Sequence, residues 1–376
     1  MRQKTLIALA IVTVPLLAAA IFVPARHGTA SRPVESGPVF PALKDWLSGT
    51  SKLIVTVGAG AGGGVINLAR TAADQGNGGG LPVEGWGLAD KGGYPVLASV
   101  IRPVIGGLAA LHTVEAKTER PKLYDRIEVN DPADKDSKAK LIELDDANGA
   151  SIVKIIVGRR HLDPLGGAGD AIYVRKPDDE RAWLAQPAFD VPGSWLDWID
   201  RTIVEIDPDK LKSLTLTPTG GSPLVLERDK AEDKWTIRDL PKDATLRSEA
   251  PGTDIAAQLR RLDLQDVRPA AQVTSPASAT VQAVTFDGLT VTASLHDQPD
   301  GSWVEVTAAG SGDAAKDADA IGKRTKGWAY KIPAQPARLL ASKMADLLTP
   351  PSPPAEPVKP APSAATSKPA IKPPGK

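Results

Sequence analysis

Apolar and polar residues alternate in a series of short segments, and this pattern predicts a chain built mainly from β-strands. One longer segment, 94–111, instead repeats apolar residues every three or four positions, which is typical of a helix that covers a sheet. We expect Pro103 to kink this helix or to delay its start. Asn148-Gly149 indicates a hairpin turn. The strands of the first half are expected near 52–57, 64–70, 84–88, 138–145, 151–158, 170–176 and 181–185.

The second half repeats much of this order, with matching points roughly 150–160 residues apart, which is too far for a solenoid repeat. We therefore predict the α+β class, with two tandem related domains, 51–203 and 204–348, each a mainly antiparallel sheet with a covering helix. A helix ending near 262 and a closing helix over 337–348 are expected. The strands are expected near 211–216, 224–228, 233–237, 281–286, 289–295, 301–306 and 327–332.

The N-terminus carries an uncharged apolar run from Leu6 to Val23, preceded by Arg2 and Lys4. Its length of about 18 residues is at the lower limit for a transmembrane helix. Residues 1–23 are therefore expected to be an uncleaved anchor, or a signal peptide that is cleaved after Ala30. The basic residues favour a cytoplasmic N-terminus. Both alternatives, with 24–50 as a linker, place most of the chain outside the cytoplasm. In a bacterium, the anchor predicts a single-pass protein of the inner membrane with its bulk in the periplasm.

The composition excludes several classes of function. The 376 residues include 45 basic and 45 acidic side chains, so no overall field attracts nucleic acid. The chain contains no cysteine, which rules out disulfides and thiolate metal sites. The tail, 349–376, holds ten prolines and four lysines. It is expected to be a disordered, extended arm, and its charge makes it a candidate for contact with the cell wall.

The motifs of the chain predict no catalytic, cofactor-binding or metal-binding residue. Gly58, Gly60 and Gly63 fit the dinucleotide pattern, but the next segment is strand-like, whereas that pattern requires a helix. A hairpin turn is therefore expected. The four histidines lack the spacing of a metal site, and no nucleophile elbow is present. We therefore expect a protein that is not an enzyme. The histidines are His27, His112, His161 and His296.

Four of the eight tryptophans are candidates for particular roles. Trp86 and Trp235 occupy matching places in the two halves, which predicts paired core anchors. Trp195 and Trp198 lie three residues apart on a short predicted amphipathic helix. They are candidates for a surface that binds a partner, or for residues that seal the junction between the two domains.

Three segments of the first half carry a resemblance to a known family: Ile155–Gly158, Ile172–Arg175 and Ser194–Asp197. With the apolar N-terminus and the order of elements, they resemble the domain-of-unknown-function 4340 family of bacterial membrane-anchored envelope proteins. The resemblance covers roughly 50–260 and extends more loosely to 348. At Leu123–Arg126 the chain departs from the family, which often has Tyr-Gly-Leu after the helix.

Members of this family often occur beside gliding-motility-type ABC-transporter subunits and their extracytoplasmic auxiliary proteins. The resemblance implies a non-catalytic periplasmic accessory or scaffold protein of an inner-membrane complex, such as an ABC-type transporter. It implies no catalytic residues. One alternative is a protein that binds an envelope polymer, either peptidoglycan or another glycan. Another alternative is a hydrolase whose active site is not indicated by any sequence motif.

Overall fold

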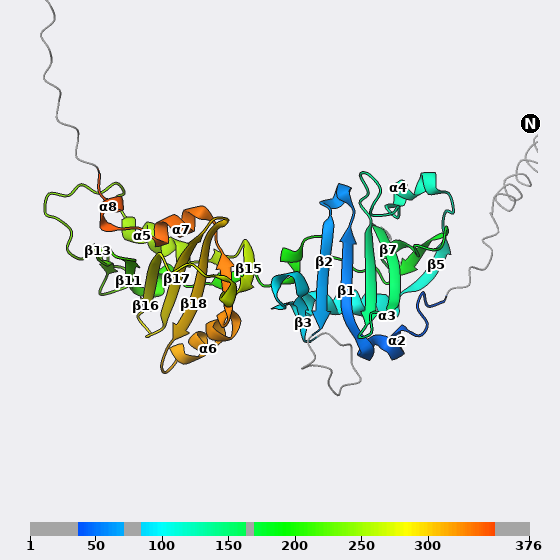
Figure 1. The fold of residues 1–376 in the computed structure, drawn as a ribbon, viewed down its shortest axis with the longest axis horizontal. Coiled ribbons are helices and arrows are strands. Elements are labelled where there is room, and N and C mark those ends of the chain that lie inside the picture. The colour runs from blue at the N-terminus through cyan, green and yellow to red at the C-terminus, as the bar shows by residue number, and fades with distance from the viewer. Residues whose placement is uncertain (1–36, 71–83, 163–168, 350–376) are drawn as a thin grey trace, which may run out of the picture.

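The computed structural model describes residues 37–70, 84–162 and 169–349 (Figure 1). Two large antiparallel sheets and a few helices make the chain an α+β protein, as predicted. The expected anchor and signal segment, the first part of the linker and nearly all of the tail lie outside the described residues. Among the described residues, no helix is both long and apolar enough to cross a membrane.

The first sheet has nine strands in the order β4-β3-β2-β1-β6-β7-β8-β9-β5. Helix α3 (Ala98–Ala110) covers one of its faces, and Ile101, Val104 and Ile105 from the helix belong to the same buried cluster as Leu53 and Val55 from the sheet. The strands are β1 (Thr50–Val57), β2 (Gly64–Arg70), β3 (Trp86–Leu88), β4 (Tyr94–Pro95), β5 (His112–Ala116), β6 (Lys140–Asp146), β7 (Ser151–His161), β8 (Ala171–Arg175) and β9 (Ala182–Gln186).

The second sheet has eight strands in the order β13-β12-β11-β16-β17-β18-β19-β15. Its strands are β11 (Leu211–Pro218), β12 (Leu224–Glu227), β13 (Thr236–Ile237), β15 (Asp266–Pro269), β16 (Ala279–Thr285), β17 (Thr290–Gln298), β18 (Gly301–Ala309) and β19 (Trp328–Lys331). The helices beside it are α5 (Pro251–Ala256), α6 (Ala314–Thr325), α7 (Ala334–Leu340) and α8 (Met344–Leu347). We call each sheet with its helices a lobe.

The two sheets follow the same strand order. If β4 is set aside, β3-β2-β1-β6-β7-β8-β9-β5 corresponds strand by strand to β13-β12-β11-β16-β17-β18-β19-β15. In both sheets the helical segment stands between the third strand and the strand that becomes the far edge. Strand β4 and helix α6 have no counterpart among the described residues of the other lobe.

Several predicted elements differ from the structure. The closing helix predicted over 337–348 is two helices, α7 and α8, and Trp195–Trp198 forms a short 3-10 helix, η6, in place of an α-helix. Strand β5 and helix α6 were not predicted. Most of β5 is exposed, so its sequence does not alternate, and α6 buries mainly small side chains, Ala314 and Ala318 with Ile321.

The glycine-rich turn between β1 and β2 is a hairpin, as predicted. A Cβ atom on Gly58 or Gly60 would overlap the main chain of Ser137 or Asp136. These two glycines therefore allow the hairpin to pack closely against the loop that precedes β6.

Candidate functional site

The junction between the lobes brings together charged side chains that are far apart in the sequence. Lys91 Nζ lies 2.6 Å from Asp266 Oδ1 of β15. The same ammonium group lies 4.7 Å from the centroid of the Trp195 ring. Lys91 therefore connects η6 of the first lobe to the edge strand of the second, through an ion pair and a cation–π contact.

An aromatic cluster fills the middle of the junction. The Tyr94 ring meets Trp328 edge-on with a centroid distance of 5.0 Å and meets Tyr330 at 6.1 Å. Beside it, a Cβ atom on Gly92 would come within 2.5 Å of Pro269 Cγ, and Gly92 has a φ of +69°. Contacts this close and aromatic pairs of this geometry favour one fixed arrangement of the lobes.

A side-chain hydrogen bond to a carbonyl, an ion pair and a short strand pairing also connect the two lobes. Arg324 of α6 donates a hydrogen bond from Nη2 to the Ile203 carbonyl at 3.0 Å, and its Nη1 lies 4.0 Å from Asp200. Strand β10 (Thr202–Val204) pairs with β14 (Leu262–Asp263) in a separate two-stranded sheet. One continuous cluster of buried side chains contains residues of both sheets. The two lobes therefore form one body.

The junction is expected to lose stability at alkaline pH. Burial raises the pKa of Tyr94 and Tyr330 above the usual value of about 10. A raised folded-state pKa stabilises the fold fully below the unfolded value, and this contribution is lost as the pH rises above about 10. In denaturant titrations across that range, the Tyr94→Phe/Tyr330→Phe variant should lose less stability than the natural chain. Identical losses would show that these two phenols do not control alkaline unfolding.

The structure separates the two tryptophans that the sequence grouped. The Trp198 side chain is fully buried, with 0% of its surface exposed, so it forms no surface for a partner. The reason is that η6 turns one face to the core, and its residue Trp198 lies on that face. Trp195 is half-buried and contacts Lys91, which places it at the edge of the junction.

The pair of tryptophans expected to be core anchors also divides. Trp86 is buried with 3% of its surface exposed, whereas Trp235 is only partly buried against the core. Arg228 covers Trp235, with its guanidinium 4.8 Å from the ring centroid. The second tryptophan therefore packs beneath an arginine side chain at the border of the core.

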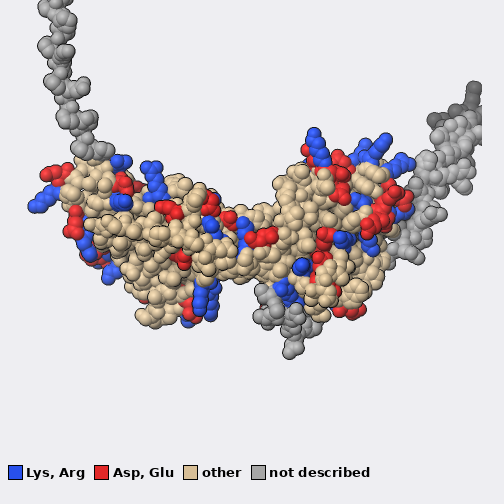
Figure 2. Space-filling view, in the orientation of Figure 1, with Lys and Arg blue, Asp and Glu red and all other residues tan. Residues whose placement is uncertain are grey.

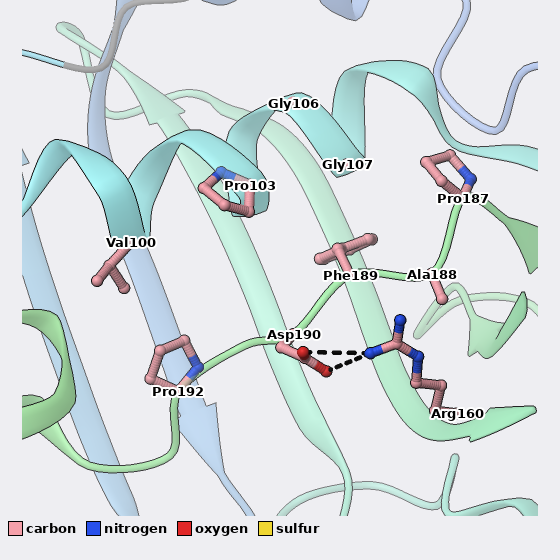
Figure 3. A pocket seen from close by; sticks show the side chains of 10 residues that line it. All are labelled: Val100, Pro103, Gly106, Gly107, Arg160, Pro187, Ala188, Phe189, Asp190 and Pro192. Carbon is pink, nitrogen blue, oxygen red and sulfur yellow. Dashed lines mark hydrogen bonds and ion pairs between the residues drawn. The ribbon is translucent and has the colours of Figure 1, made fainter. Parts of the chain in front are cut away.

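A groove of about 490 Å³ runs between α3 and the segment that follows β9 (Figure 3). Its walls are largely apolar, and it can accommodate apolar groups. We call it the α3 groove. It is lined by Val100, Pro103, Gly106 and Gly107 of α3, by Arg160 of β7, and by Pro187, Ala188, Phe189, Asp190 and Pro192.

The polar rim of the α3 groove is an ion-pair network. Arg160 Nη1 lies 3.2 Å from Asp190, as the dashed lines in Figure 3 mark, and its Nη2 lies 3.2 Å from Asp170. Asp190 is exposed, so this pairing contributes little to stability and fixes mainly the position of Arg160. No sequence pattern indicates this network, because β7 and the segment after β9 are brought together only by the fold.

Gly107 and Phe189 form the floor of the groove. A Cβ atom on Gly107 would lie 2.5 Å from the ring of Phe189. Phe189 is buried with 6% of its surface exposed. The absence of a side chain at Gly107 therefore allows the segment after β9 to lie against α3.

Two helical glycines should respond to alanine with opposite signs. Gly107→Ala should lower the free energy of unfolding by about 1–3 kcal/mol, since the ring of Phe189 must move. Gly322→Ala in α6, where no atom of the described residues lies within 4 Å of the new Cβ, should raise it by about 0.5–1 kcal/mol. Chemical denaturation of both variants provides the comparison. If Gly107→Ala were more stable than the natural chain, the ring of Phe189 would be able to move away at little energetic cost.

The segments that carried the family resemblance have structural roles in the first lobe. Arg175 is buried and donates hydrogen bonds to the carbonyls of Val129, Lys176, Pro177 and Asp179. A Cβ atom on Gly158 would overlap the carbonyl oxygens of Ile127 and Glu128 at the end of α4 (Tyr124–Ile127). These residues therefore hold the corner where β7 and β8 meet α4.

Metal binding finds no support within the described ranges, where no group of three or more His, Asp or Glu side chains has the arrangement of a metal site.

Among the described residues, the other buried arginine is Arg228, and it resembles Arg175 in its partners. It donates to the carbonyls of Leu211, Ala231 and Pro208. Both arginines therefore donate hydrogen bonds to carbonyl groups of the surrounding main chain.

Comparison with known families identifies the chain. The model of the family described as "Domain of unknown function (DUF4340)" matches residues 86–283, more than half of the chain. The protein therefore belongs to this family, as the three segments indicated. The match runs from β3 of the first lobe to β16 of the second. A search of curated proteins finds no match.

Proposed function

We propose that the protein is a non-catalytic accessory or scaffold subunit of an inner-membrane complex in the bacterial envelope, such as an ABC-type transporter. One observation supports this most. The described chain begins at the outer end of the first lobe and ends at the outer end of the second (Figure 1). The expected anchor and the expected Pro/Lys-rich arm are therefore attached to opposite ends of one elongated body. Such a body suits a spacer between the membrane and a second contact.

The junction supports the same role, because a spacer must keep its length. Lys91, Tyr94 and Gly92 of the first lobe contact the second lobe through an ion pair, aromatic packing and close main-chain approach. Figure 2 shows two lobes joined by a narrower waist, with basic and acidic side chains mixed on both lobes in this view. A surface of mixed sign suits recognition by shape and by local ion pairs.

We also propose that the lobes, 51–203 and 204–348, are two copies of one ancestral unit. The support is the strand-by-strand correspondence of the two sheets. It is reinforced by two arginines in matching places, Arg70 at the end of β2 and Arg228 just after β12. Each donates a hydrogen bond to a carbonyl of the short 3-10 helix before the first strand of its sheet, at Ser48 and Pro208.

The experiment that tests the location is fractionation of cells that express the full chain with a C-terminal tag. We expect the protein in the inner-membrane fraction after a carbonate wash, and we expect added protease to remove the tag in spheroplasts but not in intact cells. A protein recovered only from the soluble periplasm, with a mature N-terminus after Ala30, would replace the anchor with a cleaved signal.

The second candidate function is binding of an envelope polymer. The observation in its favour is the tail, which has four lysines and one acidic residue among its 28 positions. Sedimentation with purified sacculi would detect it. If the tail carries the binding, a chain that ends at Thr349 should remain in the supernatant.

A further inference from the structure

A second cavity, of about 590 Å³, lies at the end of the first sheet beside the glycine-rich hairpin. We call it the Gly-turn pocket. It is lined by the turn from Ala61 to Ile66, by Lys140 at the start of β6, and by Gly193, Ser194, Trp195 and Asp197. The spacer role uses none of these groups except Trp195, which lies at the border of the junction.

Lys140 is the charged group that reaches this pocket from the sheet. It is half-buried, and within the described part of the chain its side chain has one polar partner, the carbonyl of Val191. An ammonium group has three donors, so two remain available. Neighbouring strand β7 offers a contrast, since Lys154 lies 2.6 Å from Glu143.

Burial lowers the pKa of the Lys140 ammonium group, although Asp190 and Asp197 act in the opposite direction. No carboxylate of the described residues lies within ion-pair distance of it. A half-buried cation in this position gains most from an anion that brings its own negative charge into the pocket.

The Gly-turn pocket has apolar and polar walls, and its polar lining includes Ser194 and the carboxylate of Asp197, which forms an ion pair with Arg201. Val65 of β2 lines the pocket with 53% of its surface exposed, so its side chain is accessible to a ligand. Ile66 and the half-buried Trp195 complete the apolar lining. A cavity that combines an apolar wall with a half-buried cation, and whose one lining carboxylate among the described residues is already paired with Arg201, has the form of a small-ligand site.

We propose that the Gly-turn pocket binds a carboxylate that is attached to a body with an apolar face, with Lys140 donating to the carboxylate and Val65 and Trp195 contacting the apolar face. Two sources provide this chemistry, a carboxylated sugar of the envelope and the C-terminal residue of a peptide. The inference does not depend on the spacer role, because the pocket belongs to the first lobe alone.

The test uses two pairs of probes, in which only one member of each pair carries the carboxylate. The pairs are N-acetylmuramic acid with N-acetylglucosamine, and N-acetyl-leucine with its amide. Each probe is titrated into the full chain in detergent micelles by calorimetry and by saturation-transfer NMR. We expect an acid to bind at least about tenfold more tightly than its neutral partner, as a charge-assisted hydrogen bond predicts. The pair that responds identifies the source.

Three variants distinguish a loss of ligand binding from a loss of folding. Lys140→Met should weaken binding of the acid about tenfold or more and leave its neutral partner unchanged. Val65→Glu, on the exposed wall, should also weaken it, because the new charge repels the carboxylate. Lys154→Met is the matched control and should bind as the natural chain does. The proposal is overturned if neither acid exceeds its neutral partner, or if Val65→Glu and a folded Lys140→Met both retain full affinity.

Discussion

Replacing Gly92 with leucine is expected to separate the two lobes while leaving each sheet folded. The new Cβ atom would lie 2.5 Å from Pro269 Cγ, and the longer side chain would extend toward Trp328, whose ring is 3.7 Å from that position. The proline ring is stiff, so the clash is relieved most readily by opening the junction. Small-angle X-ray scattering should show a larger radius of gyration, and far-UV circular dichroism should be unchanged.

Gly149→Leu is the matched control for this variant. Gly149 has a φ of +81° in the turn between β6 and β7, and no atom of the described part of the chain lies within 4 Å of a new Cβ atom there. A leucine at this position therefore has the same backbone cost without a clash. Both variants should lose about 1–2 kcal/mol from the left-handed conformation. Only Gly92→Leu should change the scattering. If both variants, or neither, alter the radius of gyration, close packing at Gly92 does not hold the lobes together.

Arg175→Met is expected to lower the stability of the first lobe by about 2–4 kcal/mol. The guanidinium is buried and holds four main-chain carbonyls, with the Tyr124 ring centroid 4.7 Å away. Methionine fills part of the volume but removes the arginine donor from those carbonyls, of which that of Lys176 keeps the backbone N–H of Asp179. The change in the free energy of unfolding is measured by denaturant titration with tryptophan fluorescence as the signal.

Arg181→Met provides the comparison, since this arginine also lies beside an aromatic ring, at 5.9 Å from the centroid of Trp183. Its ion pair with Glu119 is exposed to solvent. The expected loss is at most about 1 kcal/mol. Equal losses for the two arginines would mean that the carbonyl contacts of Arg175 contribute little.

The sequence predicted many of the strands well, because strands such as β1, β11 and β16 bury one face and so show an alternating pattern. Strand β2 matches its predicted range, 64–70, and β7 extends three residues beyond the predicted end. Asn148-Gly149 and Asp287-Gly288 form turns with glycine at positive φ, as their chemistry requires. Helix α6 was not predicted, since two of its four buried residues are alanines and Lys and Asp are common among the others.

The sites were harder to predict because they depend on which surfaces the fold brings together. The spacing of Trp195 and Trp198 indicates a shared helical face, yet the direction of that face follows from the packing of η6 against α3. Likewise, Lys140 resembles any strand lysine in the sequence. Only the segment Val191–Trp195, which crosses its end, shows that the ammonium group is enclosed.

The most direct test of the accessory-subunit account is affinity purification of the full, C-terminally tagged chain from detergent-solubilised membranes, beside the Gly92→Leu and Gly149→Leu variants. The account predicts that permease and ATPase subunits of one membrane complex accompany the natural chain and the Gly149→Leu control at near-stoichiometric levels. The amounts of these subunits should be lower with Gly92→Leu, because the opened junction no longer holds the two ends of the protein at a fixed distance. Recovery of the natural chain alone would contradict the account.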